Sequence, residues 1–409
     1  MKVLIVSNLF PPRVIGGAEV AACAWACWLA GRGHEVRVLT TASAEHPEGV
    51  RETEDGIIVE RRDFGYVYPL GQLTRPPALR RAVWHWQDHF GGEAGRYCAA
   101  AIAEFQPDVI NCHDLQGLGY AVLRDIAASG VPCLQTLHDF GFLCVNMAMF
   151  RHGAECIQQH LVCRISTAVK RSAWAGIRRL SFWSPSRALL ERYRPHLPPH
   201  LEAAALPLPL SFAAPTGLRR PATGIVRLLY VGQVTEIKGV EFILRVLTEL
   251  ARTHAFHFQV VGGGAELERL RGLYEQASWV SFSGRVPPAK VGDFMEESDL
   301  LLTPSLWFEN SPLVIYQAIH LGLPVLASRT GGLPELVADE VSGALEAPGD
   351  VAAWTARLRA ILSDSSILAR WRAGAKERRA AFAIDACGER VLSLLERTAD
   401  AAPLPMPVG

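Results

Sequence analysis

Two charged residues stand in loops that follow short apolar runs, where strands of a parallel sheet end and ligands bind. Lys238 lies in the segment Val231-Gly-Gln-Val-Thr-Glu-Ile-Lys-Gly-Val240 and is one of five lysines in the chain. A cation at a helix start opposes the helix dipole, so this position favours a phosphate ligand over a solvated lysine. Glu309 lies in the loop before a helix predicted to begin near Leu313. Its carboxylate suits sugar hydroxyls, and the alternative is an ordinary acidic residue at a helix N-terminus.

Glycines in two further loops allow close approach to a ligand. Gly16 and Gly17 stand between the first strand and the first helix, where free N–H groups can bind an anion; a plain turn is the alternative. Neither this loop nor the Val260–Ala265 segment, which contains Gly263, carries the complete Gly-x-Gly-x-x-Gly dinucleotide fingerprint. A tight strand–helix turn is the preferred interpretation of the Gly263 segment.

The elements that must position these residues alternate between short apolar runs and amphipathic stretches, which predicts βαβ units and parallel sheets. The predicted strands are 3–6, 36–39, 57–60, 109–111, 133–137, 180–183, 228–231, 257–261, 279–283, 300–302 and 324–327. The predicted helices are 18–30, 84–105, 240–250, 266–276, 313–321 and 351–362.

Length and composition bound the class of protein. The chain has 409 residues, which favours two domains, and its 41 basic residues balance 41 acidic ones. Neutrality argues against a generally basic nucleic-acid binder, and we expect no nucleic-acid partner. Nine cysteines, no secretory signal and no apolar run of about 18 residues favour a reduced, cytoplasmic protein.

A run rich in proline between residues 206 and 221 predicts the boundary between the domains. We expect an N-terminal Rossmann-like domain at 1–206, a linker at 207–222 and a C-terminal Rossmann-like domain at 223–385. A C-terminal helix at 386–400 that packs back on the N-domain and a frayed tail at 401–409 complete the prediction.

The ordered set of motifs resembles glycosyltransferase family 4, with the GT-B fold of two Rossmann-like domains facing a cleft. The motifs are Pro11-Pro12, Gly16-Gly17-Ala18-Glu19, Gly33-His34-Glu35-Val36, His138-Asp139, Ser184-Pro185-Ser186, Gly232, Lys238-Gly239, Pro304-Ser305, Glu309, Gly331-Gly332 and Glu335. They span almost the whole chain in the order typical of the family.

The resemblance implies a retaining transfer from a nucleotide-sugar donor, without a metal or other cofactor, to a glycan or lipid-linked acceptor in cell-envelope polysaccharide or glycoconjugate assembly. It makes the domain at 1–206 the acceptor side and the domain at 223–385 the nucleotide-sugar-binding domain. It places His138, Lys238 and Glu309 in the catalytic site. The donor site it implies consists of Gly16, Gly17, Gln233, Lys238, Gly263, Glu309, Leu313, Val314 and Gln317. In this assignment the backbone at Leu313 and Val314 caps the phosphate and Gln317 faces the ribose.

Two positions depart from the family pattern. Gln233 stands where an arginine normally joins the lysine on the diphosphate, and Gln317 replaces the second glutamate of a Glu-x7-Glu pair. Arg13 or Arg285 could supply the missing cation. A catalytically weak nucleotide-sugar-binding protein and a sugar-nucleotide epimerase of the same fold remain the alternatives.

The stretch Arg164–Arg194 contains eight basic residues and one acid, Glu191. With Val169, Trp174 and Ile177 between the cations, it resembles a helix on an anionic membrane surface; a solvated basic face or a site for acceptor phosphate are the alternatives. The protein would then be peripheral on the inner face of the membrane. Cys144, Cys156 and Cys163 fall where some family members have four cysteines, but Ser166 takes the fourth place, and ordinary reduced thiols are preferred over a zinc site that borrows His152 or His160.

Overall fold

The computed structural model describes residues 1–70, 76–151, 154–156, 158–215 and 224–403. The chain divides into two compact units. Unit 1 takes Met1–Arg151, Cys156–Leu210 and Ile384–Gly409, and unit 2 takes Ser211–Ala383 with the short segment at Ala154–Glu155. Part of the predicted linker, 216–222, and part of the predicted tail, 404–409, lie outside the described residues.

Unit 1 is built on an eight-stranded sheet in the order β10-β9-β6-β5-β1-β2-β4-β3, in which only the β3–β4 pair is antiparallel. Its central strands are continuous apolar runs because helices cover both faces. The strands are β1 (Lys2–Val6), β2 (Glu35–Thr41), β3 (Gly49–Glu52), β4 (Ile58–Arg62), β5 (Val109–Cys112), β6 (Cys133–Thr136), β9 (Leu180–Ser184) and β10 (Ala203–Ala205). A separate two-stranded ladder joins β7 (Phe150–Arg151) and β8 (Ala154–Glu155).

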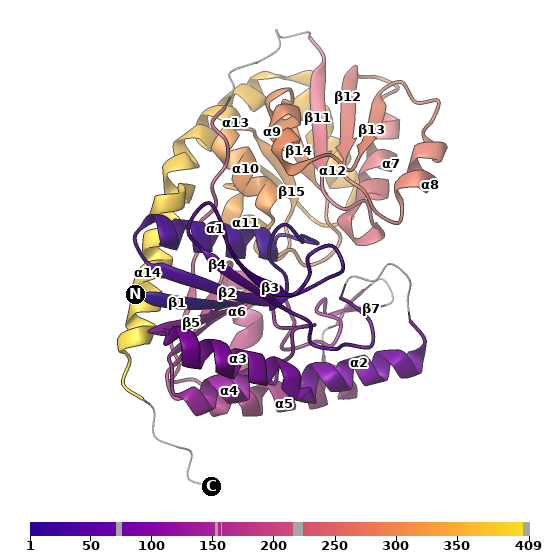
Figure 1. Ribbon diagram of the computed structural model, residues 1–409. Coiled ribbons are helices and arrows are strands. Elements are labelled where there is room, and N and C mark those ends of the chain that lie inside the picture. The colour runs from indigo at the N-terminus through magenta and orange to yellow at the C-terminus, as the bar shows by residue number, and fades with distance from the viewer. Residues whose placement is uncertain (71–75, 152–153, 157, 216–223, 404–409) are drawn as a thin grey trace. The chain divides into compact units, whose positions relative to one another are not determined.

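Helices flank this sheet on both sides (Figure 1). They are α1 (Ala18–Gly31), α2 (Ala78–Phe90), α3 (Gly92–Phe105), α4 (Val122–Ser129), α5 (Leu161–Ala175), α6 (Arg187–Tyr193) and α14 (Ile384–Asp400). The helical segment predicted at 84–105 is confirmed except at Gly91, where a break divides it between α2 and α3. The backbone of Gly91 is extended (φ −62°, ψ 123°), which ends one helix before the next begins. Glycine also has the lowest helix propensity of any residue except proline.

The last helix, α14, belongs to unit 1 and packs against α1. Trp28 donates from its indole N–H to Asp385 (2.8 Å), and Arg32 reaches both Asp385 and Glu389. Glycine at position 388 permits the approach, because a Cβ there would collide with the ring of Trp28. Helix α14 therefore completes the layer of helices on this side of the unit 1 sheet.

Unit 2 contains a parallel six-stranded sheet in the order β13-β12-β11-β14-β15-β16. The strands are β11 (Val226–Val231), β12 (Phe256–Val261), β13 (Val280–Gly284), β14 (Leu300–Thr303), β15 (Val325–Ser328) and β16 (Gly343–Glu346). The helices are α7 (Val240–Leu250), α8 (Leu267–Leu273), α9 (Pro288–Glu296), α10 (Leu313–Leu321), α11 (Leu333–Leu336), α12 (Val351–Ser363) and α13 (Ser366–Glu377). The core centres on the apolar sides of β11, β12, α7 and α12, where Phe242 meets Trp354 edge to face at 5.7 Å.

Each unit is thus a parallel α/β domain of the Rossmann-like type, with helices on both faces of its sheet. Among the described residues, none of the helices combines the length and the apolarity that a membrane span requires.

Candidate active site

Lys238 and Glu309 meet at the carboxyl edge of the unit 2 sheet. Lys238 ends a short 3-10 turn after β11, and Glu309 lies in the loop after β14. Because β11 and β14 are parallel neighbours, their carboxyl ends bring the two loops together. The ammonium group donates to Glu309 Oε1 at 2.6 Å, and the hydroxyl of Ser305 donates to the same oxygen at 2.5 Å.

Backbone packing holds these two loops rigidly against each other. Gly239 has a φ of 73°, and a Cβ there would collide with the carbonyl of Pro304. Gly331 has a φ of 54° and is pressed in the same way against the backbone of Glu309, whose carbonyl accepts from the N–H of Gly332 at 2.7 Å. Both positions require glycine. The Glu309 side chain is therefore presented from a well-fixed loop, and the residue is only 6% exposed.

The loops after β11, β12 and β13 form a continuous ledge beside Lys238. The N–H of residue 232 bonds to Val261 O, that of Val234 to Gly263 O, and that of Gly262 to Gly284 O. Gln233, at the surface of this ledge, is exposed, and its carbonyl accepts from the hydroxyl of Tyr230 at 2.7 Å.

Arg285 lies next to Gly263 on the same ledge. A Cβ on Gly263 would lie 3.8 Å from Arg285 Cβ and 3.9 Å from its Nε. Within the described part of the chain, Arg285 is exposed and makes no hydrogen bond or ion pair. Arg13 and Arg285 were considered as substitutes for the family arginine that Gln233 replaces. Arg285 lies in unit 2, beside the predicted donor-site residue Gly263. Arg13 lies in unit 1 and donates to the carbonyls of Leu70 and Ala42.

The helix α10 begins directly after the Glu309 loop. Pro312 is the N-cap residue and makes no side-chain cap to the first N–H groups of the helix, at Leu313 and Val314. Such a helix start attracts an anion. Gln317 lies one turn further along, with its amide nitrogen 3.6 Å from the Cβ position of Gly292 in α9. The predicted donor residues of unit 2 therefore occupy neighbouring loops and one helix start at a single edge of its sheet.

The remaining predicted residues belong to unit 1. Gly16 and Gly17 precede α1, and the N–H of Gly16 donates to Glu19 Oε2 at 3.0 Å. The buried carboxylate of Glu19 is thus already bound to the loop before this helix. A phosphate that approached these N–H groups would meet that negative charge, which the sequence analysis did not anticipate.

His138 follows β6 and contacts a second histidine. Its Nε2 lies 2.8 Å from Nδ1 of His113, and the two rings stack at 5.1 Å. His113 in turn bonds to Asn111 Oδ1 at 3.2 Å. Burial lowers the pKa of His138 to about 4 and holds that of His113 well below its usual value. Both imidazoles are neutral at pH 7.

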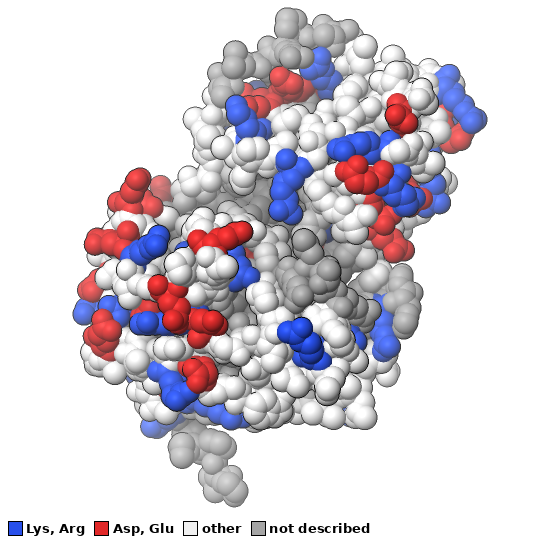
Figure 2. All heavy atoms as spheres, turned by 45° about the vertical axis from the view of Figure 1, so that its right-hand side comes forward, with Lys and Arg blue, Asp and Glu red and all other residues white. Residues whose placement is uncertain are grey.

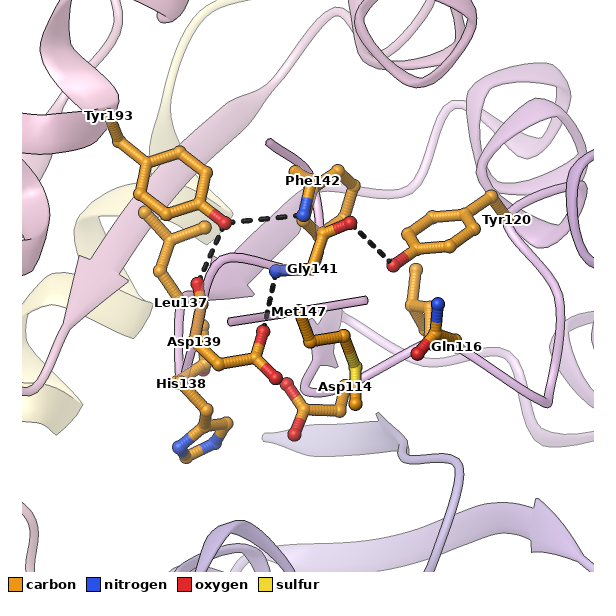
Figure 3. Close-up of a pocket in the computed structure, with 12 residues that line it drawn as sticks. Asp114, Gln116, Tyr120, Leu137, His138, Asp139, Gly141, Phe142, Met147 and Tyr193 are labelled. Atoms are coloured by element: carbon orange, nitrogen blue, oxygen red, sulfur yellow. Dashed lines mark hydrogen bonds between the residues drawn. The ribbon is translucent and has the colours of Figure 1, made fainter. Parts of the chain in front are cut away.

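A small polar pocket beside His138 contains residues that the sequence analysis did not assign (Figure 3). Its volume is about 10 Å³, which suits one water-sized group. The carboxyl groups of Asp114 and Asp139 point toward each other across it, and the His138 ring turns away from them. Burial raises the pKa of Asp139 to about 6. The pKa of Asp114 is raised well above its usual value, first by burial and second by the nearby carboxylate of Asp139.

The loop that carries His138 and Asp139 is held by a buried lysine. Lys170 of α5 donates to the carbonyl of Gly141 at 2.6 Å and lies over the ring of Tyr120 at 3.9 Å. It is only 1% exposed, and burial lowers its pKa to about 8. The Asp139 carboxylate accepts from the N–H of Gly141 at 2.6 Å. Two features of the sequence could have indicated this arrangement. Asp139 and Gly141 have the Asp-x-Gly spacing of a turn, and Lys170 is one of only five lysines.

A larger cavity of about 650 Å³ opens elsewhere in unit 1. Its lining combines the aromatic rings of Phe64 and Tyr66 with Arg13, Arg62 and two acids, and the full set is Arg13, Thr41, Ala42, Ser43, Ala44, Pro47, Glu48, Arg62, Asp63, Phe64, Tyr66, Pro69, Leu70 and Gly117. Gly117 follows Gln116, which lines the small pocket near His138.

The basic stretch 164–194 does not form one continuous helix, and its attraction to an anionic membrane stays a prediction. The stretch spans most of α5, the buried strand β9 and the start of a turn after α6. Lys170, Trp174 and Ile177 are buried in unit 1, and Trp174 stacks on Phe142 at 4.0 Å. Lys170 and Trp174 lie on the inward side of α5, whereas Arg164, Ile165 and Arg171 on its outward side are exposed.

The nine cysteines are free thiols, and burial raises the pKa of Cys163. Among the described residues, no three His, Cys, Asp or Glu side chains lie close enough together to hold a metal ion. His152, one of the residues considered for a zinc site with the cysteines, lies outside the described residues.

Two family models match the chain, one on each side of the boundary between the units. The model of the glycosyl transferase 4-like domain matches residues 16–209, and that of glycosyl transferases group 1 matches residues 222–378.

Single proteins and solved structures agree with these matches. An uncharacterized 42.6 kDa protein in the cps region of Klebsiella pneumoniae is 25% identical over 82% of this chain and 87% of its own length. Sucrose-phosphate synthase from Thermosynechococcus elongatus has a TM-score of 0.75 at 19% identity, covering 98% of this chain and 100% of its own. HepE from Anabaena in complex with UDP has a TM-score of 0.68 at 16% identity, covering 97% and 100%.

Proposed function

The chain belongs to the family 4-like glycosyltransferases of GT-B fold, and we propose that it transfers a hexose, with retention of configuration, from a nucleotide-sugar donor to a glycan or lipid-linked acceptor. The observation that carries this proposal is the contact of Lys238 with Glu309 beside the uncapped start of α10. A cation, a helix N-terminus and a carboxylate thus lie together at the carboxyl edge of the unit 2 sheet. The first two groups can bind a diphosphate, and the carboxylate can accept hydrogen bonds from sugar hydroxyls. HepE, which shares the fold, was solved with UDP.

The chemistry follows from these groups. The difficult step is departure of the diphosphate from an oxocarbenium-like centre, so donors aimed at the developing phosphate charge lower the barrier. Lys238 and the first N–H groups of α10 supply such donors without a metal ion or other cofactor. When the diphosphate engages Lys238, Glu309 is released to accept hydrogen bonds from sugar hydroxyls. His138, which is neutral at pH 7, can accept or donate one hydrogen bond to the substrate without adding charge.

The cavity of about 650 Å³ in unit 1 is our proposed acceptor site. Its aromatic rings can stack on sugar rings, and its mixed arginines, acids and hydroxyl groups can bond to sugar hydroxyls. The relative from the Klebsiella cps region supports a role in polysaccharide or glycoconjugate assembly at the cell envelope. A cytoplasmic location, peripheral on the inner face of the membrane, fits an acceptor carried on lipid.

Calorimetry with UDP, ADP and GDP and their glucose conjugates, followed by a transfer assay with and without EDTA, tests the proposal. We expect submillimolar binding of one nucleotide series, turnover insensitive to EDTA, and a product whose NMR coupling constant shows the same anomer as the donor. An inverted product or loss of turnover in EDTA would disprove the mechanism.

One observation favours a second candidate, a nucleotide-sugar-binding protein without efficient catalysis. The position of the family arginine holds the exposed, uncharged Gln233, which provides no permanent charge for the diphosphate. Tight donor binding with neither hydrolysis nor transfer on any acceptor glycan tested would select this candidate.

A further inference from the structure

The outward sides of α2 and α5 expose large apolar side chains. On α2, Leu79, Val83, Trp86 and Phe90 recur at positions i, i+4, i+7 and i+11, which lie on one face of a helix. Leu79 is 77% exposed and Trp86 62%. On α5, Leu161 is 70% exposed, and Val162 and Ile165 are also exposed.

These two helices are neighbours in the layer of unit 1 that lies opposite α1 (Figure 1). His89 of α2 and Ser166 of α5 bond across the contact at 2.7 Å, and both lie on the inward sides. The apolar residues are thus not a frayed end, because the opposite sides of the same helices are anchored in the core by Trp84 and Trp174. We call the outward side of this pair the α2–α5 face.

The charges on the α2–α5 face have one sign. Arg80, Arg164 and Arg171 are exposed, and Arg124 of the adjacent α4 lies over the ring of Phe90 at 5.9 Å. The one acid of α2, Asp88, is buried, and α5 contains no acid. In Figure 2 the lower right of unit 1, toward which α2 points in Figure 1, shows cations among white side chains and no carboxylate.

We propose that the α2–α5 face binds the surface of an anionic lipid bilayer, with its apolar side chains inserted among the acyl chains and its arginines at the headgroup phosphates. Tryptophan and phenylalanine beside arginine are the residues expected at that depth. A second copy of the chain is a poorer occupant, because two such faces would bring their arginines together with no acid between them. The inference rests on the proposed function and deepens it, because an enzyme that acts on a lipid-linked acceptor must reach that acceptor at a membrane.

Sedimentation with vesicles tests this proposal on the full chain. We expect binding to vesicles of equal parts phosphatidylglycerol and phosphatidylcholine, at least 10-fold weaker binding to pure phosphatidylcholine, and weakening as salt rises. The variants Trp86→Ser and Leu161→Ser should each reduce partitioning to anionic vesicles at least 5-fold, and Arg80→Glu with Arg164→Glu should do the same. Leu273→Ser, at a similarly exposed leucine of unit 2, is the matched control and should leave partitioning unchanged.

Several results would overturn the inference. They are equal binding to both vesicle types, an unchanged partition of Trp86→Ser, or a dimer in light scattering that Trp86→Ser converts to a monomer, which would make the face a contact between copies. Donor binding by calorimetry separates this outcome from failure of the proposed function. The surface variants should keep the wild-type affinity for the nucleotide, whereas a protein that binds vesicles but no nucleotide would refute the function alone.

Discussion

Lys238 and Glu309 form an ion pair at 2.6 Å between Nζ and Oε1, although 71 residues separate them in the chain. The pair joins the residue predicted to bind phosphate to the residue predicted to bind the sugar. The two side chains bond to each other, and Ser305 donates to the same carboxylate oxygen. We propose that a donor diphosphate competes with Glu309 for Lys238, which would couple diphosphate binding to release of the carboxylate predicted to bind the sugar.

Lys238→Ala should weaken binding of the donor nucleotide about 10- to 100-fold, because a hydrogen bond to a charged group contributes about 1.5–3 kcal/mol. Calorimetry measures the dissociation constant. Lys290→Ala is the control, since Lys290 is exposed and pairs only with Asp293 at 3.1 Å. Equal losses in both variants would show that Lys238 acts only through general charge.

Gln233→Arg should tighten nucleotide binding about 10-fold, because it restores a forked cation to the ledge beside Lys238. Arg285→Ala should weaken binding, since Arg285 is the cation found next to Gly263. The dissociation constants of the single and double variants measure the coupling between the two positions. If Arg285 substitutes for the missing arginine, its removal should matter less once Gln233 is arginine, and strictly additive effects would reject that role.

His138 should titrate near pH 4, as the side-chain resonances in an NMR titration will show, because burial lowers its pKa to about 4. In the unfolded chain histidine titrates near pH 6.5, so the unfolded state binds an additional proton between these values. The contribution of His138 to stability is therefore complete above about pH 6.5 and is lost as the pH falls toward 4. His138→Asn should depend less on pH over this interval in urea unfolding, and an unchanged slope or a resonance midpoint near 6.5 would contradict the assignment.

Lys170→Met should lower the free energy of unfolding by about 3–5 kcal/mol, because it leaves the buried carboxyl of Asp88 and the Gly141 carbonyl without their cation. Urea unfolding measures the change. Lys290→Met, at an exposed position, should change it by less than about 0.5 kcal/mol. Asp88→Asn added to Lys170→Met should recover part of the loss, and a double variant no better than the single one would show that Asp88 does not need the lysine.

Local patterns in the sequence were sufficient to predict the parallel α/β architecture. Runs such as Val3–Val6 and Leu300–Leu302 are apolar on both sides because the strands are covered on both faces, and this continuity can be read without the fold. Glycines and prolines likewise mark the loops where Lys238 and Glu309 stand. The break at Gly91 was missed, because an amphipathic period continues on either side of it and only the backbone conformation shows that the helix stops.

Tertiary structure alone decided which groups face each other. No spacing in the sequence indicates that Glu19 accepts a hydrogen bond from Gly16 or that Lys238 pairs with Glu309. The same holds for the facing carboxyl groups of Asp114 and Asp139. The arginine-rich stretch 164–194 shows the same limit. Its composition suggested one basic surface, whereas the fold buries Lys170 and Trp174 and leaves Ile165 exposed. The sequence by itself determined the elements and the chemistry available to them, because periodicity and residue type are local. Burial and pairing depend on strand order and helix orientation, which arise from contacts between residues far apart in the chain.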